Sequence, residues 1–284
     1  MTIRIVTDST CDLPDDLAKE YNIRVIPCYI NLEGQSYLDG IQITRSQFYE
    51  KISSLKSPPT SSAPGIGAFV DAYKNLAAEG AGEIISIHVS SALSNIPNVA
   101  KMAADASDGI QVTVVDGGQL SLGTGFLALA AAKAAREGRS RKDIIKIIDD
   151  QKERTYAFAA LDRLDYLRRS GRVSILQSSL GSLLQIKPIL SIHVGEVILE
   201  RVRTHIAAIA KLVDIARAFQ PVERMAILHT HAPDEAELLK KKIEPFISGS
   251  VAVLLVEATP ILGVHFGPGA VGCVCIKAFQ SNKH

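Results

Sequence analysis

The sequence predicts an α/β protein of two domains: an N-terminal parallel-sheet α/β domain and a C-terminal mixed α+β domain, with a ligand cleft between them. Short β-branched runs alternate with longer helical patterns through the first half, which is typical of βαβ units. The second half contains "HVGEV", a hairpin signal between two β-branched runs. We expect the domains to span 1–157 and 158–284. No linker marks the boundary, so the halves are expected to pack closely.

In the first half, nearly continuous apolar strands are expected to alternate with helices, as in parallel sheets that helices cover on both faces. Thr44 can cap the start of one helix, and Gly138 follows the end of another. Residues 57–67 are expected to form a loop. The expected strands are 3–8, 23–32, 83–89 and 110–116, and the expected helices are 14–21, 44–54, 68–80, 99–106, 125–138 and 141–154.

In the second half, strands and helices are mixed and at least one antiparallel hairpin is present. Residues 263–272, "GVHFGPGAVG", are expected to be a loop between two strands, because glycine and proline interrupt two good strand patterns there. The expected strands are 155–162, 223–231, 250–262 and 272–279 with a hairpin over 187–203, and the expected helices are 163–171, 173–186, 206–219 and 233–246.

The composition is that of a soluble globular protein, which we expect to be cytoplasmic. Of 284 residues, 47% are hydrophobic and 21% are charged. The net charge of +1 gives no long-range attraction to nucleic acid, so we expect no nucleic-acid partner. No run reaches the roughly 18 to 20 apolar residues that a membrane span needs. The first residues enter a strand pattern at once, so no secretory signal is expected.

Several motifs resemble parts of cofactor or metal sites, but a structural role explains each of them better. "GTGFLA" (123–128) matches a relaxed dinucleotide fingerprint, but it does not directly follow a strand, so its glycines are expected to allow close packing of a helix start. "HTH" (229–231) and the pair Cys273 and Cys275 each supply two metal ligands without a third. His88 and His193 lie in apolar strands. We therefore expect no metal site and no cofactor.

No residue pattern supports nucleophilic catalysis, and Asp8 is the best single candidate for an acid with a chemical role. What remains is a set of hydrogen-bond donors in loops, beside glycine-rich backbone at residues 267 and 269. Hydroxyls, backbone N–H groups and an imidazole are what a carboxylate or phosphate needs. The residues of this set are Ser61, Ser62, Ser91, Ser94 and His265.

Seven segments in order resemble the DegV family, which includes the fatty-acid-binding subunits of bacterial fatty acid kinase. They are "VTDSTCDLP", "PTSSAPGIGAF", "ISIHVSSALS", "LDYLRRSGRVS", "LLQIKPIL", "RVRT" and "HFGPGAVG". The resemblance covers nearly the whole chain. Each segment alone is weakly specific, but the ordered set is highly specific.

The resemblance implies a non-catalytic lipid-binding protein that holds a long-chain fatty acid in an interdomain tunnel. A tail of about 14 to 18 carbons would supply much of the affinity, because each buried methylene contributes about 0.8 kcal/mol. The carboxylate would be presented to a separate ATP-binding kinase subunit, which forms the acyl phosphate for phospholipid synthesis. The bound fatty acid would be the only ligand, and transient contact with a membrane surface is compatible with this role.

The resemblance also assigns residues. Pro64 and Gly67 align a family threonine of the head-group site with Ser61, although a slip of one residue would select Thr60. Ser62 lies in the same loop, and Ser94 and His265 match the other head-group residues. The family's basic residues at the entrance or partner contact are matched by Arg172 and Arg203.

Two departures from the family pattern bear on these assignments. "NIP" (95–97) replaces the usual Gly-Thr after Ser94, and "HIAAIA" (205–210) is less basic than the family. An enzyme acting on a small phosphorylated or carbonyl substrate in a polar interdomain cleft is the alternative, and a pure interaction module is a third reading. A closed apolar tunnel would favour the first interpretation, and a short polar pocket the second.

Overall fold

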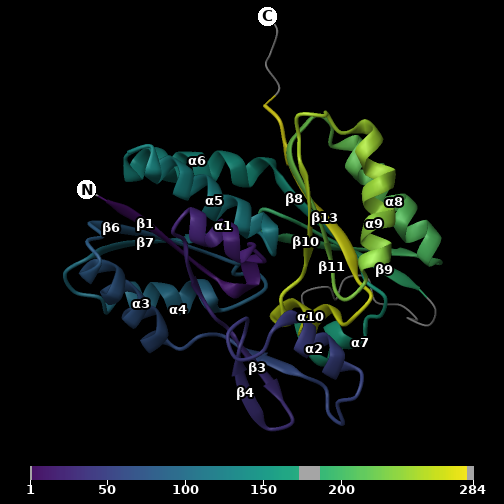
Figure 1. The fold of residues 1–284 in the computed structure, drawn as a ribbon, viewed down its shortest axis with the longest axis horizontal. Helices are drawn as coiled ribbons and strands as arrows, with labels where there is room; N and C mark the ends of the chain where they lie inside the picture. Colours follow the sequence, from purple (N-terminus) through teal and green to yellow (C-terminus); the bar gives the residue numbers. More distant parts are fainter. Residues whose placement is uncertain (1, 173–185, 280–284) are drawn as a thin grey trace, which may run out of the picture.

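The computed structural model describes residues 2–172 and 186–279. Its first sheet is fully parallel, in the order β2-β1-β6-β7, as the sequence predicted. The helices α3 (Ile66–Ala78) and α4 (Ile96–Asp105) cover one face, and α5 (Leu122–Arg136) and α6 (Arg141–Arg154) cover the other (Figure 1). The strands are β1 (Ile3–Asp8), β2 (Arg24–Ile26), β6 (Glu83–His88) and β7 (Gln111–Asp116).

The second sheet is six-stranded and mixed, in the order β10-β9-β8-β13-β11-β12. The expected hairpin is β9 and β10, joined at Val194 and Gly195, which both have positive φ as a type I′ turn requires. Helices α8 (His205–Ala218) and α9 (Pro233–Ile243) cover its outer face. The strands are β8 (Thr155–Ala160), β9 (Lys187–His193), β10 (Glu196–Val202), β11 (Val222–His229), β12 (Val253–Glu257) and β13 (Val271–Lys277).

Helix α5 joins the two halves because it packs between the two sheets. Its apolar residues share one core with Ile85 and Ile87 of β6 and with Val274 and Ile276 of β13. Gly125 is needed there, since a Cβ at this position would come within 2.6 Å of the Cys11 carbonyl oxygen. The glycines of "GTGFLA" therefore serve close helix packing, as expected. The division into domains at residue 157 stays a prediction, and Ala157 itself lies in β8.

A small third sheet, in the order β4-β3-β5, was not predicted. The segment 23–32 was expected to be one strand, but it forms β2 and β3 (Tyr29–Leu32) in two different sheets. Pro27 lies between them and has no N–H to continue a ladder. The other strands are β4 (Gln35–Leu38) and β5 (Thr60–Ser62), so the predicted loop 57–67 contains a short strand that pairs with β3.

The expected loop at 263–272 is also wrong in part, because Pro260–Phe266 is a helix, α10. Thr259 precedes it in an extended conformation, and Pro260 occupies its first turn, where a missing N–H costs nothing. The expected helix at 173–186 lies almost wholly outside the described residues. The remaining short elements are α1 (Asp15–Glu20), α2 (Arg45–Ile52), α7 (Asp165–Arg169) and the single turns η1 (Ser9–Cys11) and η3 (Glu244–Phe246).

Candidate functional site

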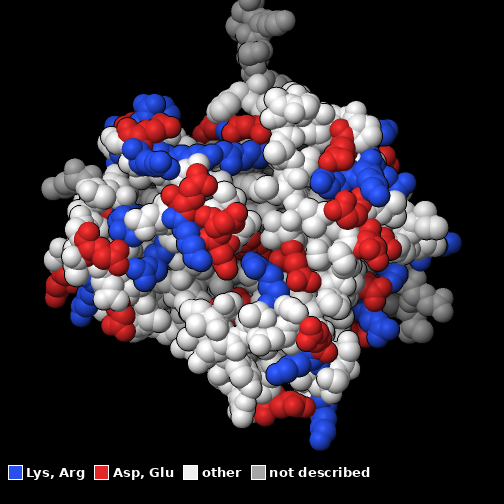
Figure 2. All heavy atoms as spheres, viewed as in Figure 1, with Lys and Arg blue, Asp and Glu red and all other residues white. Residues whose placement is uncertain are grey.

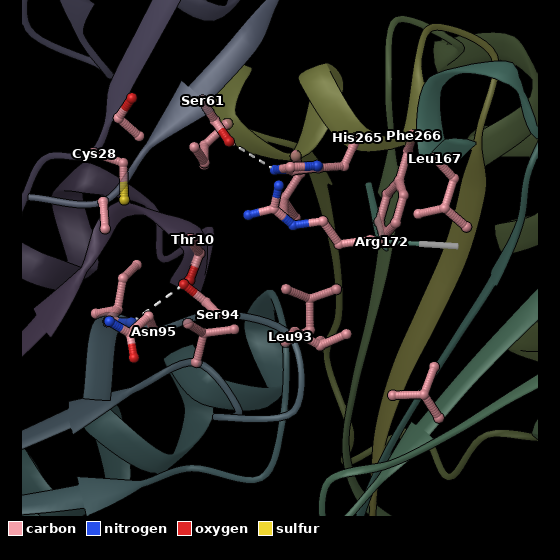
Figure 3. Close-up of a pocket in the computed structure, with 18 of the residues that line it drawn as sticks. Thr10, Cys28, Ser61, Leu93, Ser94, Asn95, Leu167, Arg172, His265 and Phe266 are labelled. Atoms are coloured by element: carbon pink, nitrogen blue, oxygen red, sulfur yellow. Dashed lines mark hydrogen bonds between the residues drawn. The ribbon is translucent and has the colours of Figure 1, made fainter. Parts of the chain in front are cut away.

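A pocket of about 170 Å³ lies where loops from both halves of the chain meet. The polar groups of Ser61, His265 and Arg172 lie close together, with Phe266 beside the Arg172 side chain and Leu93 below it in the view of Figure 3. The two halves therefore share a cleft, as the sequence predicted, and most of its surface is apolar. Its further polar lining residues are Thr10, Ser62, Ser94 and Asn95, and its further apolar ones include Val89, Leu167, Leu190, Val197, Ile261 and Leu262.

The centre of the polar side is a contact between Ser61 and His265. The Ser61 Oγ lies 3.0 Å from the His265 Nε2, although the two residues are 204 positions apart in the chain. Strand β5 holds Ser61 through its pairing with Ile30 of β3. Helix α10 carries His265 in its last turn, so the imidazole sits on a helix and not in the loop that the sequence suggested.

His265 is in an environment that disfavours its charged form. Burial, together with the positive charge of Arg172, lowers the pKa of the imidazole to about 3. Its Nδ1 is buried and has no hydrogen-bond partner among the described residues. The neutral ring therefore has one N–H and one lone pair. Its N–H can donate a hydrogen bond to an anionic ligand.

Arg172 is placed as the sequence suggested, beyond α7 and facing the cleft. Its guanidinium points toward Ser61 and His265 (Figure 3). One of its nitrogens, Nη1, donates to the Ser170 carbonyl oxygen at 2.6 Å, which fixes the side chain near the end of α7. Arg172 supplies a positive charge next to the neutral imidazole.

Ser94 and Asn95 approach the pocket from the loop that follows β6. The Ser94 Oγ accepts a hydrogen bond from the Ile96 N–H at 3.3 Å, at the start of α4. The unusual "NIP" segment forms this helix start, with Pro97 in its first turn. Asn95 has φ −83°, so this departure from the family pattern needs no left-handed residue.

The structure does not bring all the predicted residues together. Thr60 is exposed and accepts a hydrogen bond from the Asn31 amide at 3.3 Å, while strand alternation turns Ser61 to the opposite face. Ser91 is exposed, and its N–H donates to the Asp116 carboxylate. Arg203 is exposed just before α8 and does not line the pocket. Its role in partner contact stays a prediction.

Sequence analysis missed several lining residues. Thr10, in the "TDST" loop after β1, lines the pocket, and its hydroxyl donates to the Asp8 carboxylate at 2.5 Å. Its place in a hydroxyl-rich loop after a strand was the signal that could have found it. The apolar walls from Leu190, Ile261 and Phe266 carried no such signal, because they look like ordinary core residues.

A second, smaller apolar space of about 50 Å³ adjoins the pocket. The two spaces share Leu120, Leu190, Leu262 and Phe266, whose side chains lie between them. Small residues of the six-stranded sheet, among them Ala157 and Gly272, line the far side. An apolar path therefore leads from the polar side toward the strands of the second sheet.

A separate polar network lies beside the pocket and is completely buried. The Asp8 carboxylate accepts from the His88 Nδ1 at 2.8 Å, and the His88 Nε2 lies 2.7 Å from the Ser86 Oγ. The Tyr73 hydroxyl donates to the same Ser86 oxygen at 2.9 Å. One assignment of the hydrogen atoms gives each side chain of this network a partner. Asp8 thus holds the loop of Thr10 in place, and His88 is a core residue.

The structure also places the remaining histidine and cysteine motifs. Across residues 2–172 and 186–279, no three His, Cys, Asp or Glu side chains form a group that could hold a metal ion. His231 stacks on Tyr49, with ring centroids 5.6 Å apart, and His193 lies against Tyr156. Burial raises the pKa of Cys273 to about 12 and also raises the pKa of Cys275, so both thiols stay protonated. No helix in the same part of the chain is long and apolar enough to span a membrane.

The arrangement as a whole matches known proteins. The model of the DegV family, whose members are described as uncharacterised, matches residues 2–278. This chain belongs to the DegV family. A DegV domain-containing protein of Listeria innocua is 33% identical over 274 residues, covering 95% of this chain and 96% of that protein.

Solved DegV structures share the fold over the whole length. A DegV family protein from Thermus thermophilus, described by its fatty acid binding, has a TM-score of 0.88 at 31% identity. DegV from Bacillus subtilis, described as a fatty acid binding protein, has a TM-score of 0.88 at 32% identity. In both cases the match covers 98% of this chain and 100% of the other. The two-domain DegV fold predicted from the sequence is thereby confirmed.

Proposed function

We propose that this DegV protein binds a long-chain fatty acid, with the carboxylate at Ser61 and His265 and the tail along the apolar path toward the second sheet. The observation that carries this proposal is the Ser61–His265 contact in a pocket whose surface is mostly apolar. The fatty acid binding described for the Thermus and Bacillus relatives supports it.

The charge balance of the site suits a carboxylate. An unpaired carboxylate is expensive to bury, so its oxygens need donors and a positive charge close by. Ser61 and Ser94 supply hydroxyls, the neutral His265 supplies an N–H, and Arg172 supplies the charge. The carboxylate would in turn favour the protonated form of His265.

The tail would occupy both apolar spaces. Because Leu120, Leu190, Leu262 and Phe266 lie between the two spaces, we expect these side chains to shift when a long chain enters. Each methylene that leaves water contributes about 0.8 kcal/mol, so the tail supplies much of the binding free energy. The Gly and Ala residues of the second sheet leave room at the far end.

We further propose that the protein does no chemistry itself and presents the carboxylate to a separate kinase subunit, which transfers a phosphoryl group from ATP. Arg172 at the polar side and the exposed Arg203 are the candidates for contact with that subunit. This step is supported if acyl phosphate forms only when the kinase subunit and the lipid-loaded protein are both present. Acyl phosphate formation by the kinase subunit with free fatty acid alone would contradict it.

Fatty acid binding is tested by extraction and by uptake. Protein purified from a bacterial host should carry a fatty acid detectable by mass spectrometry, and delipidated protein should take up oleate. Ser61→Ala and Ser94→Ala should each weaken uptake about tenfold, because each removes a hydrogen bond to a charged group worth about 1.5 kcal/mol or more.

Ser91→Ala is the matched control, because Ser91 is an exposed serine near the same loop and does not line the pocket. It should leave uptake unchanged. Reproducibly empty protein that takes up no oleate would reject the function. Normal uptake by the Ser61→Ala, Ser94→Ala double variant would reject the placement of the carboxylate while leaving lipid binding intact.

A further inference from the structure

One buried carboxylate, that of Asp12, joins three segments of the chain. On the face of the molecule that carries α1 and α10, acidic and basic side chains lie close together at the surface (Figure 2), whereas Asp12 is only 1% exposed. One of its carboxylate oxygens accepts from the Thr259 N–H at 2.7 Å, and the other accepts from the Ser121 hydroxyl at 2.5 Å. Asp12 directly follows η1, so it links η1 to the residues that precede α10 and α5.

Each of these three segments carries side chains that line the pocket. Thr10 lies in η1, Leu120 comes directly before Ser121, and His265 lies in the last turn of α10. The relative positions of these lining residues therefore depend on how the segments are held together. Asp12 itself does not line the pocket, so it acts on a ligand only through them.

The start of α10 depends on the contact with Asp12. The N-cap residue Thr259 does not cap the helix with its own side chain, and its hydroxyl donates instead to the Ser9 carbonyl oxygen at 3.1 Å. The Asp12 carboxylate accepts from the N–H of this N-cap residue, as a glutamate does in a capping box, but from 247 positions away in the chain. Because α10 is only seven residues long, fixing its start also sets where His265 lies.

The backbone on both sides of the Asp12–Ser121 hydrogen bond is unusual. Asp12 has φ 51° and Ser121 has φ 58°, so both residues are in left-handed conformations. Aspartate tolerates this region, but Ser121, with ψ −143°, lies close to a region that glycine alone adopts readily. Such residues persist where the surrounding structure holds them, and they cluster at functional sites. The hydrogen bond to Asp12 explains why a serine is held in this conformation.

We propose that Asp12 is a positioning residue of the head-group site: by holding the start of α10 against η1, it keeps the His265 imidazole within reach of Ser61 and of the bound carboxylate. This inference rests on the proposed binding of a fatty acid. The Ser61 Oγ and the His265 Nε2 lie 3.0 Å apart. Because a separation of about 3.6 Å is no longer a hydrogen bond, a small movement of α10 would part the imidazole from the head group. Most of the apolar lining belongs to other elements, so the tail depends less on this position.

The test compares two lipids with the same tail and different head groups, oleate and oleyl alcohol. Delipidated full-length protein is equilibrated with each lipid, and the bound amount is measured by mass spectrometry after extraction. Asp12→Ala should weaken oleate binding about tenfold and oleyl alcohol binding less than about threefold, because the hydrogen bond to a charged head group is the stronger one. A purely structural role of Asp12 would weaken the binding of both lipids by the same factor.

Two further variants separate positioning from charge and from stability. Asp12→Asn should bind oleate within about threefold of wild type, because its amide oxygen can accept from Thr259 while its NH2 group donates to the Ser121 oxygen. Leu239→Ala is the control for lost stability, since Leu239 is fully buried between α9 and the second sheet and does not line the pocket. This control should leave the ratio of the two lipid affinities unchanged.

If Asp12→Ala does not fold, Ser121→Gly decides, because glycine adopts φ 58° without strain and lacks the hydroxyl that contacts Asp12. It should lower the ratio of oleate affinity to oleyl alcohol affinity about threefold. An unchanged ratio in the deciding variant, or a loss in Asp12→Asn as large as that in Asp12→Ala, would overturn the proposal. Wild-type protein that takes up oleate keeps the proposed function intact in either case, so the two failures are distinct.

Discussion

Two serine–histidine pairs among the described residues, Ser86–His88 and Ser61–His265, differ in what surrounds them. His88 contacts Ser86 through one ring nitrogen and Asp8 through the other, and all three side chains are fully buried. His265 contacts Ser61 through one nitrogen, but its other nitrogen has no hydrogen-bond partner in the described part of the chain, and the pair faces a pocket.

The difference bears on what each pair can do. Nucleophilic catalysis by serine needs a histidine that a carboxylate orients and a serine that substrate can reach. The pair with the carboxylate is buried, and among the described residues no carboxylate hydrogen-bonds to the open pair. The buried pair is therefore structural, and the open pair is suited to binding the head group of a ligand.

The largest effect that would separate the two pairs is expected from Asp8→Ala. This change leaves His88, the Thr10 N–H and the Thr10 hydroxyl without their buried acceptor. We expect a loss of about 3 to 5 kcal/mol in the free energy of unfolding, measured by urea denaturation. Asp108→Ala, at an exposed turn, is the control and should change it by less than about 0.5 kcal/mol. A similar small change for Asp8→Ala would show that the buried network contributes little.

Replacing the serine of the buried pair should also lower the free energy of unfolding more than replacing the serine of the open pair, but the difference should be smaller than that for Asp8→Ala. Ser86→Ala removes the shared partner of His88 and Tyr73, and should cost about 2 kcal/mol because two buried polar groups lose a hydrogen bond. Ser61→Ala, at a half-buried site, should cost less than about 1 kcal/mol in delipidated protein. Thermal and urea unfolding of both variants would check this. Equal costs would contradict the distinction between a structural and a ligand-binding serine.

A third expected difference is a pH dependence that belongs to His265. Its pKa falls from 6.5 to about 3 on folding, so the unfolded chain binds the extra proton below pH 6.5 and stability falls as the pH falls through this range. Between pH 6 and pH 5 the loss should be about 1 kcal/mol larger in delipidated wild type than in His265→Asn. Parallel pH profiles for the two proteins would show that the ring is not shielded from water.

The sequence predicted much of the fold because local patterns decided it. Continuous apolar strands alternating with helices predicted the parallel sheet, and the "HVGEV" turn predicted the β9–β10 hairpin. The errors occurred where local and tertiary signals differ. Pro27 transfers the chain from one sheet to another, which no pattern within 23–32 reveals. The apolar run before His265 resembled a strand, although Thr259 and Pro260 mark a helix start.

The candidate site was predicted in its polar part and missed in the rest. Ser61, Ser94 and His265 were found because they are hydrogen-bond donors in expected loops and because they match the head-group positions of the family that the sequence resembles. Their meeting at one pocket depends on three sheets and could not be derived from spacing.

Gly267, which ends α10 with φ 68°, lies directly against the ring of Tyr166 in α7, and a Cβ there would overlap that ring. Helices α10 and α7 carry or precede His265 and Arg172, so a side chain at position 267 would force the two helices apart. A genetic screen for variants that no longer bind the ligand would then recover substitutions of Gly267, which does not line the pocket. The positions found in such a screen would therefore include residues that do not contact the ligand.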